Sequence, residues 1–75
     1  SGFAYASDVK EIKLGQLEQQ LLDAQIRQCT ATTSDSKRYY ANKVRELSRK
    51  YRDTDGYYPP IPRCDEVLVN SDIAR

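Results

Sequence analysis

Hydrophobic residues recur every three or four positions over residues 8–29, which is the spacing of one face of an α-helix. The main stripe consists of Leu14, Leu17, Leu21, Ala24 and Gln28. A second stripe beside it consists of Leu22, Ile26 and Cys29. Together the stripes are wider than the roughly 100° that one packing surface usually needs, so we expect this helix to contact two neighbours.

The ends of this first helix are predicted from its flanking residues. Ser7 or Asp8 can cap its start, and Glu11 follows Asp8 at the spacing of a capping box. Residues 30–34 are rich in Thr and Ser, whose side chains compete for backbone hydrogen bonds and favour turns. The sequence therefore predicts a helix over residues 8–29, followed by a turn.

A second helix is predicted over residues 35–53, and it has its own apolar stripe. The residues of that stripe are Tyr40, Val44, Leu47 and Tyr51. The two helices' stripes are out of phase by two residues, so one straight helix would point them in different directions. An antiparallel hairpin lets them pack together, with Leu14, Leu17 and Leu21 on the first helix. The alternative is one long helix that dimerises as a coiled coil.

The C-terminal part is predicted to be an extended tail over residues 54–69. Gly56 can end the second helix, and three prolines then favour a polyproline II conformation: Pro59, Pro60 and Pro62. Residues 67–69 are expected to form a short strand or a helical turn, and residues 70–75 a loose terminus. The expected fold is all-α: one small domain, a two-helix antiparallel hairpin with the tail folded back along it.

The small size of the chain predicts a need for a staple or a partner. A chain of 75 residues buries only about 60% of the surface that its unfolded form exposes. Only 39% of its residues are hydrophobic, with no Trp and one Phe, so a thick core cannot be built.

Cys29 and Cys64 are the predicted staple. The second helix is about 28 Å long, and an extended tail of about 11 residues reaches about 34 Å. The returning tail can therefore bring Cys64 to Cys29, with Ile61 and Val67 covering the second stripe. Two free thiols and an intermolecular disulfide are the alternatives.

The N-terminal residues favour export. Ala4-Tyr5-Ala6 matches the small-x-small pattern of a signal-peptide cleavage site, with Ser7 as the first mature residue. A disulfide between the cysteines would fit the same oxidising compartment. We therefore expect a periplasmic or otherwise secreted protein, with a cytoplasmic location as the alternative. No apolar run approaches the roughly 20 residues of a membrane span, and anchoring by a preceding N-terminal segment stays open.

Charge is strongly segregated, although the net charge is only +1. Residues 1–36 carry three basic and five acidic residues, a net charge of −2. Residues 37–52 carry seven basic residues and one acidic residue, a net charge of +6. Residues 53–75 carry two basic and five acidic residues, a net charge of −3. An anionic partner is therefore expected to bind the middle segment.

One face of the second helix concentrates this positive charge. We call it the Arg face, and it consists of Arg38, Asn42, Arg45, Arg49 and Arg52. These residues lie opposite the apolar stripe at about 100° per residue, so packing of the stripe exposes them. Guanidinium groups bind carboxylates or phosphates in pairs of hydrogen bonds. The alternative is that the acidic tail folds over the face and neutralises it with Asp53, Asp55, Asp65 and Glu66.

No residue pattern indicates catalysis or a cofactor. The chain has no His, and two widely spaced cysteines do not match a metal site or a Cys–His nucleophile. We therefore expect a non-enzymatic interaction module without metal, which binds a protein partner of acidic character. An accessory protein, an inhibitor, the soluble part of a membrane-anchored subunit and a homo-oligomer all fit. The alternative is an intracellular helical dimer that binds nucleic acid through the Arg face.

Overall fold

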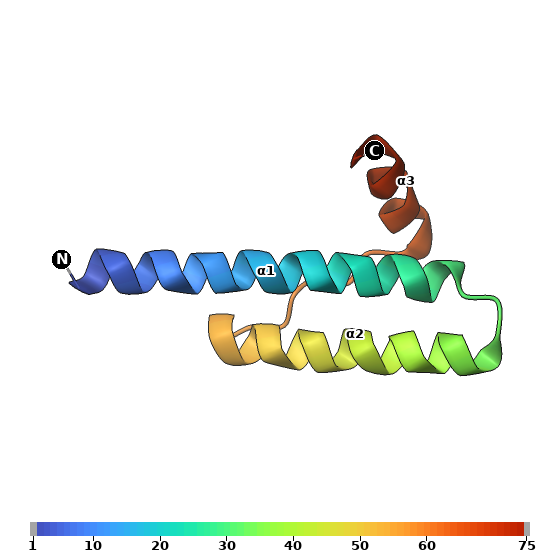
Figure 1. Cartoon of the computed structure of the whole chain (residues 1–75), viewed down its shortest axis with the longest axis horizontal. Helices are drawn as coiled ribbons and strands as arrows, with labels where there is room; N and C mark the ends of the chain where they lie inside the picture. The colour runs from blue at the N-terminus through green and yellow to red at the C-terminus, as the bar shows by residue number, and fades with distance from the viewer. Residues whose placement is uncertain (1, 75) are drawn as a thin grey trace.

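The computed structural model describes the backbone of residues 2–74 and the side chains of residues 9–69. Within them the chain forms three helices and no strand: α1 (Gly2–Thr30), α2 (Ser34–Asp55) and α3 (Cys64–Ala74). The expectation of an all-helical chain is confirmed. Figure 1 shows α1 and α2 side by side and running in opposite directions, with the N-terminal part of α1 extending beyond α2.

The core lies between α1 and α2. Its buried side chains are Leu17, Leu21, Ala24, Val44 and Leu47, and Tyr51 packs against them. Leu14 and Tyr40, the outermost residues of the predicted packing stripes, are half-buried. The apolar stripes of the two helices therefore face each other. This arrangement is favoured because packing the two stripes together removes the apolar surface of both from water.

Both ends of α2 have caps that the local sequence explains. Thr33 is in an extended conformation before the helix, and its Oγ1 accepts a hydrogen bond from the Ser36 backbone N–H at 3.1 Å. At the other end Gly56 has a φ of 100°, and its N–H donates to the Arg52 carbonyl at 2.7 Å. Glycine adopts this left-handed conformation without a steric penalty, so it ends the helix here.

The first helix begins earlier than the sequence predicts. It is continuous from Gly2, so Ser7 and Asp8 lie inside it and the expected caps at these residues were wrong. Residues 3–6 contain two alanines and no proline or glycine, so nothing interrupts the helix there. The interpretation of Ala4-Tyr5-Ala6 as a cleavage site concerns side chains outside the described residues.

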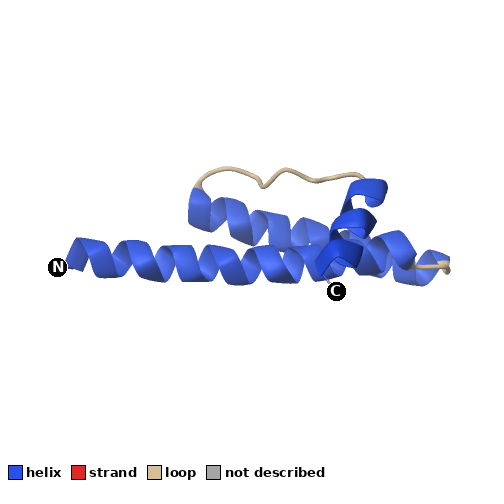
Figure 2. Ribbon diagram, turned by 90° about the horizontal axis from the view of Figure 1, so that it is seen from above, coloured by secondary structure: helices blue, strands red, loops and turns tan. Residues whose placement is uncertain are grey.

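Residues 57–63 form an extended segment, which we call the strap. Figure 2 shows it returning from the end of α2, along the two long helices, to the start of α3. Pro59 is buried, whereas Ile61 is 57% exposed. Ile61 therefore does not cover the second stripe as expected: a polyproline II segment has three residues per turn, so Pro59 shares its side with the half-buried Pro62, and Ile61 lies on another side.

The segment after the strap is a helix, which corrects the prediction of an extended tail through residue 69. α3 packs against α1, and Val67, with 1% of its surface exposed, is the most deeply buried of its described side chains. The Val67 N–H donates to the Arg63 carbonyl at 3.0 Å. Asp65 and Glu66 occupy the first turn, where negative charge is favoured by the helix dipole. The helix continues to Ala74, where a loose terminus was expected.

Candidate functional site

The Arg face lies on the outer side of α2. Arg38, Arg45 and Arg49 are exposed, as is Asn42, and Arg52 is half-exposed. The apolar side of the helix, which includes Val44 and Leu47, faces α1, so the helical period turns the arginines away from the core. Asn42 Oδ1 accepts a hydrogen bond from Arg45 Nη1 at 3.2 Å.

The acidic tail does not cover the centre of this face. Asp65 and Glu66 both pair with Arg63, at 3.2 and 3.6 Å. Asp53 pairs with its neighbour Arg52 at 3.1 Å. Among the side chains of residues 9–69, no carboxylate lies within ion-pair distance of Arg38, Arg45 or Arg49, so neutralisation by the tail is limited to Arg52.

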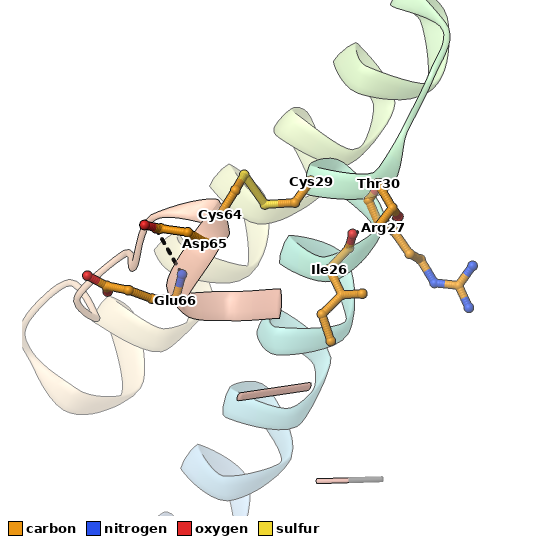
Figure 3. The surroundings of a disulfide bond; sticks show 7 residues. All are labelled: Ile26, Arg27, Cys29, Thr30, Cys64, Asp65 and Glu66. Carbon is orange, nitrogen blue, oxygen red and sulfur yellow. Dashed lines mark hydrogen bonds between the residues drawn. A yellow bond between two sulfur atoms is a disulfide. The ribbon is translucent and has the colours of Figure 1, made fainter. Parts of the chain in front are cut away.

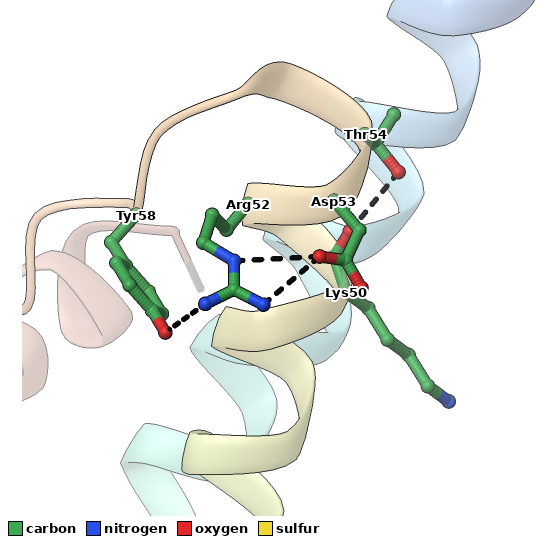
Figure 4. Close-up of polar contacts among 5 residues, drawn as sticks. All are labelled: Lys50, Arg52, Asp53, Thr54 and Tyr58. Atoms are coloured by element: carbon green, nitrogen blue, oxygen red, sulfur yellow. Dashed lines mark hydrogen bonds and ion pairs between the residues drawn. The ribbon is translucent and has the colours of Figure 1, made fainter.

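Arg52 has a second role, because it joins the strap to α2 (Figure 4). Its Nη1 donates to the Tyr58 hydroxyl at 2.6 Å, and its guanidinium carbon lies 4.9 Å from the centre of the Tyr58 ring. The hydrogen bond to Asp53 and the charge interaction with Tyr58 raise the pKa of Arg52. Sequence reasoning missed this contact because it depends on the path that the strap takes.

The other end of the strap is joined to α1 by the two cysteines. Cys29 and Cys64 lie at disulfide distance, with their Cα atoms 5.5 Å apart, and Figure 3 shows the bond between the end of α1 and the start of α3. Beside the bond, Asp65 Oδ1 accepts a hydrogen bond from the Glu66 N–H at 2.9 Å. The strap is therefore held at both ends, by Arg52 with Tyr58 and by the cysteine pair.

Polar groups gather beneath the strap. A cavity of about 190 Å³ is lined there by Glu18, Leu21, Gln25, Tyr51, Pro59 and Pro60. The Tyr51 hydroxyl donates to Glu18 Oε1 at 3.2 Å. Burial first, and then this hydrogen bond, raise the pKa of Tyr51. The buried side-chain amide nitrogen of Gln25, which lines this cavity, has no hydrogen-bond partner among the described residues. The same holds for the buried Ser48 hydroxyl, which is not among the lining residues.

The fold and the site together define a small helical protein with a cysteine staple and an exposed arginine face. In comparisons with known proteins, no family model, no curated protein and no solved structure matches the chain. None of the helices in the described part of the chain has the length and apolar character needed to cross a membrane. Over the same residues, no three His, Cys, Asp or Glu side chains are grouped so that they could hold a metal ion.

Proposed function

We propose that this chain is a non-catalytic binding protein that contacts an acidic protein surface through the Arg face of α2. One observation carries the proposal: Arg38, Arg45 and Arg49 are exposed in one row, and no carboxylate described in the structure pairs with them. An unpaired guanidinium can form a bidentate pair with a carboxylate of a partner. Such a row offers that contact several times along one rigid helix.

The spacing of the row suits carboxylates on another folded protein. At about 1.5 Å per residue, Arg38 lies about 10 Å from Arg45 along the axis, and Arg45 about 6 Å from Arg49. Carboxylates one or two helical turns apart on a partner helix have the same spacing. The strap adds rigidity beside the row, because it holds Arg52 from the other side.

An acidic protein fits this face better than nucleic acid does. Glu46 and Asp53 lie on the same helix as the arginines, and both are exposed. Asp65 and Glu66 add exposed negative charge at the start of α3. These carboxylates would repel a continuous phosphate backbone, whereas a folded protein can place its acidic residues opposite the arginines alone.

The proposal includes export to an oxidising compartment, with cleavage after Ala6. The cysteine pair supports it, because such bonds persist mainly outside the cytoplasm. Intact mass of the native protein without reductant tests this part. We expect a chain that starts at Ser7 and gains the mass of about two hydrogens on reduction. A chain with free thiols and residues 1–6 retained would contradict export.

Binding to defined probes tests the Arg face itself. The probes are a fluorescent glutamate-rich peptide and a DNA duplex of similar charge, and binding is followed by fluorescence anisotropy. The test variant is Arg45→Gln with Arg49→Gln. The matched control is Lys10→Gln with Lys13→Gln, which removes two exposed charges from α1.

We expect the unmodified chain to bind the peptide more tightly than the duplex. The Arg45 and Arg49 variant should weaken peptide binding about tenfold, which corresponds to about 1.4 kcal/mol, and the lysine variant should have little effect. Equal losses in the two variants would show non-specific attraction and would reject the site. Tighter binding to the duplex, falling steeply with salt, would favour the nucleic-acid alternative.

A further inference from the structure

A groove runs between α1 and α2 on the side away from the strap. α1 lines this groove with Gln20, Asp23 and Arg27, whereas it lines the cavity under the strap with Glu18 and Gln25. At about 100° per residue these two sets point to opposite sides of the helix. The groove encloses about 400 Å³ and is separate from both the strap and the Arg face.

The floor of the groove is apolar and one of its walls is aromatic. Ala24 and Leu47, only 3% and 4% exposed, form part of the lining. Tyr39 and Tyr40 line it on the α2 side, with ring centres 5.0 Å apart and ring planes at 89°. Tyr39 is 61% exposed, so a large aromatic surface beside a core residue faces solvent. Such a surface favours contact with apolar side chains of a partner.

The charged residues around the groove are mainly basic. Arg27, Lys43 and Lys50 line it, against one acidic lining residue, Asp23, which leaves a net charge of +2. Asp23 pairs with Arg27 at 3.1 Å, and Lys50 pairs with Glu46 at 3.4 Å. Within residues 9–69, no carboxylate lies within ion-pair distance of Lys43. The groove therefore combines apolar contact with an available positive charge.

We propose that this groove docks an amphipathic helix with acidic flanks, supplied by a partner protein. Two antiparallel helices leave a groove that a third helix fills with its apolar face. On α2 the lining extends from Tyr39 to Lys50, about 16 Å along the axis, which matches about three turns of a helix. Apolar side chains of the partner pack against the rings of Tyr39 and Tyr40, and its carboxylates pair with Lys43.

Charge complementarity selects this partner over a second copy of the chain. The described part of α1 that extends beyond α2 exposes Val9 and Ile12, and Lys10, Glu11 and Lys13 lie on the same turns with a net charge of +1. If a second copy docked through this segment, Lys10 and Lys13 would lie against the basic groove and would be repelled by Lys43. A helix that carries glutamates at the corresponding positions avoids this repulsion.

The experiment is a titration of the isotope-labelled, unreduced full chain, followed by backbone amide chemical shifts. The probe is a synthetic helical peptide of about 14 residues, with leucines on one face and glutamates on its flanks. We expect saturable shifts at Ala24, Tyr40 and Leu47. A second peptide with glutamine in place of glutamate should bind at least about tenfold more weakly.

Two variants locate the contact on the protein. Lys43→Glu reverses an exposed charge and should weaken binding of the acidic peptide at least about tenfold. Arg45→Gln, on the Arg face, should leave binding to the groove unchanged. Because the two surfaces occupy different sides of α2, loss of one interaction leaves the other measurable.

Three results would overturn the inference. Shifts confined to the Arg face would place the peptide at the other site. Equal affinity for the acidic and neutral peptides would remove the argument from charge. Shifts at Ala24, Tyr40 and Leu47 on simple concentration of the chain would show that a second copy occupies the groove.

Discussion

Removing the cysteine staple is expected to remove most of the stability of this small domain. Cys29 and Cys64 are 35 residues apart in sequence. For a loop of this length the chain-entropy relation gives about 4 kcal/mol at 25 °C. The Cys29→Ala, Cys64→Ala double variant should therefore lose about 4 kcal/mol of its free energy of unfolding.

This loss is large because little else holds the C-terminal part in place. Six hydrophobic side chains are buried among the described residues, and only Val67 belongs to α3. Within the described residues α3 contacts α1 but not α2, and the staple is the covalent cross-link that ties this helix to α1 in addition to the main chain. A small domain often has only about 5 kcal/mol of stability in total, so the double variant should be close to its unfolding midpoint in water.

Urea denaturation followed by circular dichroism measures this difference. The unmodified chain with reductant serves as a second route to the same state, and it should agree with the double variant. A loss of less than about 1 kcal/mol in both would refute the chain-entropy reasoning. A loss in the double variant without any effect of reductant would show instead that the substituted side chains matter and the bond does not.

Three further predictions concern the core, the end of α2 and pH. In urea denaturation, Leu47→Ala should lower the free energy of unfolding by about 2–4 kcal/mol because the Leu47 side chain is only 4% exposed. The control Ile12→Ala, at a residue 62% exposed, should change it by less than about 0.5 kcal/mol. Similar losses in the two variants would place the core elsewhere. Gly56→Ala should lower the free energy of unfolding by about 1 kcal/mol in thermal unfolding, because alanine is strained at a φ of 100° even though its Cβ would meet open space. An unchanged unfolding midpoint would contradict this helix end. Burial and the hydrogen bond to Glu18 raise the pKa of Tyr51, so its neutral form stabilises the fold at pH values below the usual tyrosine pKa of 10.0, and this contribution is lost as pH rises through the raised value. Ultraviolet titration of the parent and of Tyr51→Phe should show that the parent has one tyrosine that ionises at higher pH than the others. Identical titration midpoints in the two proteins would contradict this.

The apolar stripes were the most informative part of the sequence. Their helical spacing predicts two helices, and the phase difference between them favours a turn close to Thr33. The pattern is informative because burial is periodic along a helix. Leu17 and Leu47 are buried for this reason. The ends of the helices are harder to predict, because they depend on capping residues that give only a weak signal in the sequence.

The region after Gly56 was harder to predict. Val67 and Val69 are β-branched and follow an extended proline segment, which favours a strand by propensity alone. The structure buries Val67 on a helix, so contact with α1 overrides that propensity. Similarly, the pairing of Tyr58 with Arg52 requires the strap to pass one particular side of α2, and no local pattern encodes that side.

The Arg face could be predicted from helical spacing, but whether its arginines pair with carboxylates of the chain could not. Spacing places Arg38, Arg45 and Arg49 on one side of a helix, and the structure exposes them there. Whether the acidic tail covers them depends on the three-dimensional path of the chain. Arg63 takes up Asp65 and Glu66 locally, and this short-range pairing leaves the row free of these carboxylates.

The most direct test of the proposed function is to observe the arginine side chains themselves. The side-chain Nε–H signals of the unreduced, isotope-labelled chain are recorded during titration with the glutamate-rich peptide. We predict that the signals of Arg38, Arg45 and Arg49 shift together and saturate at one affinity, while those of Arg27 and Arg63 stay in place. Shifts of similar size at all five arginines, or none at the first three, would contradict a binding site on the Arg face.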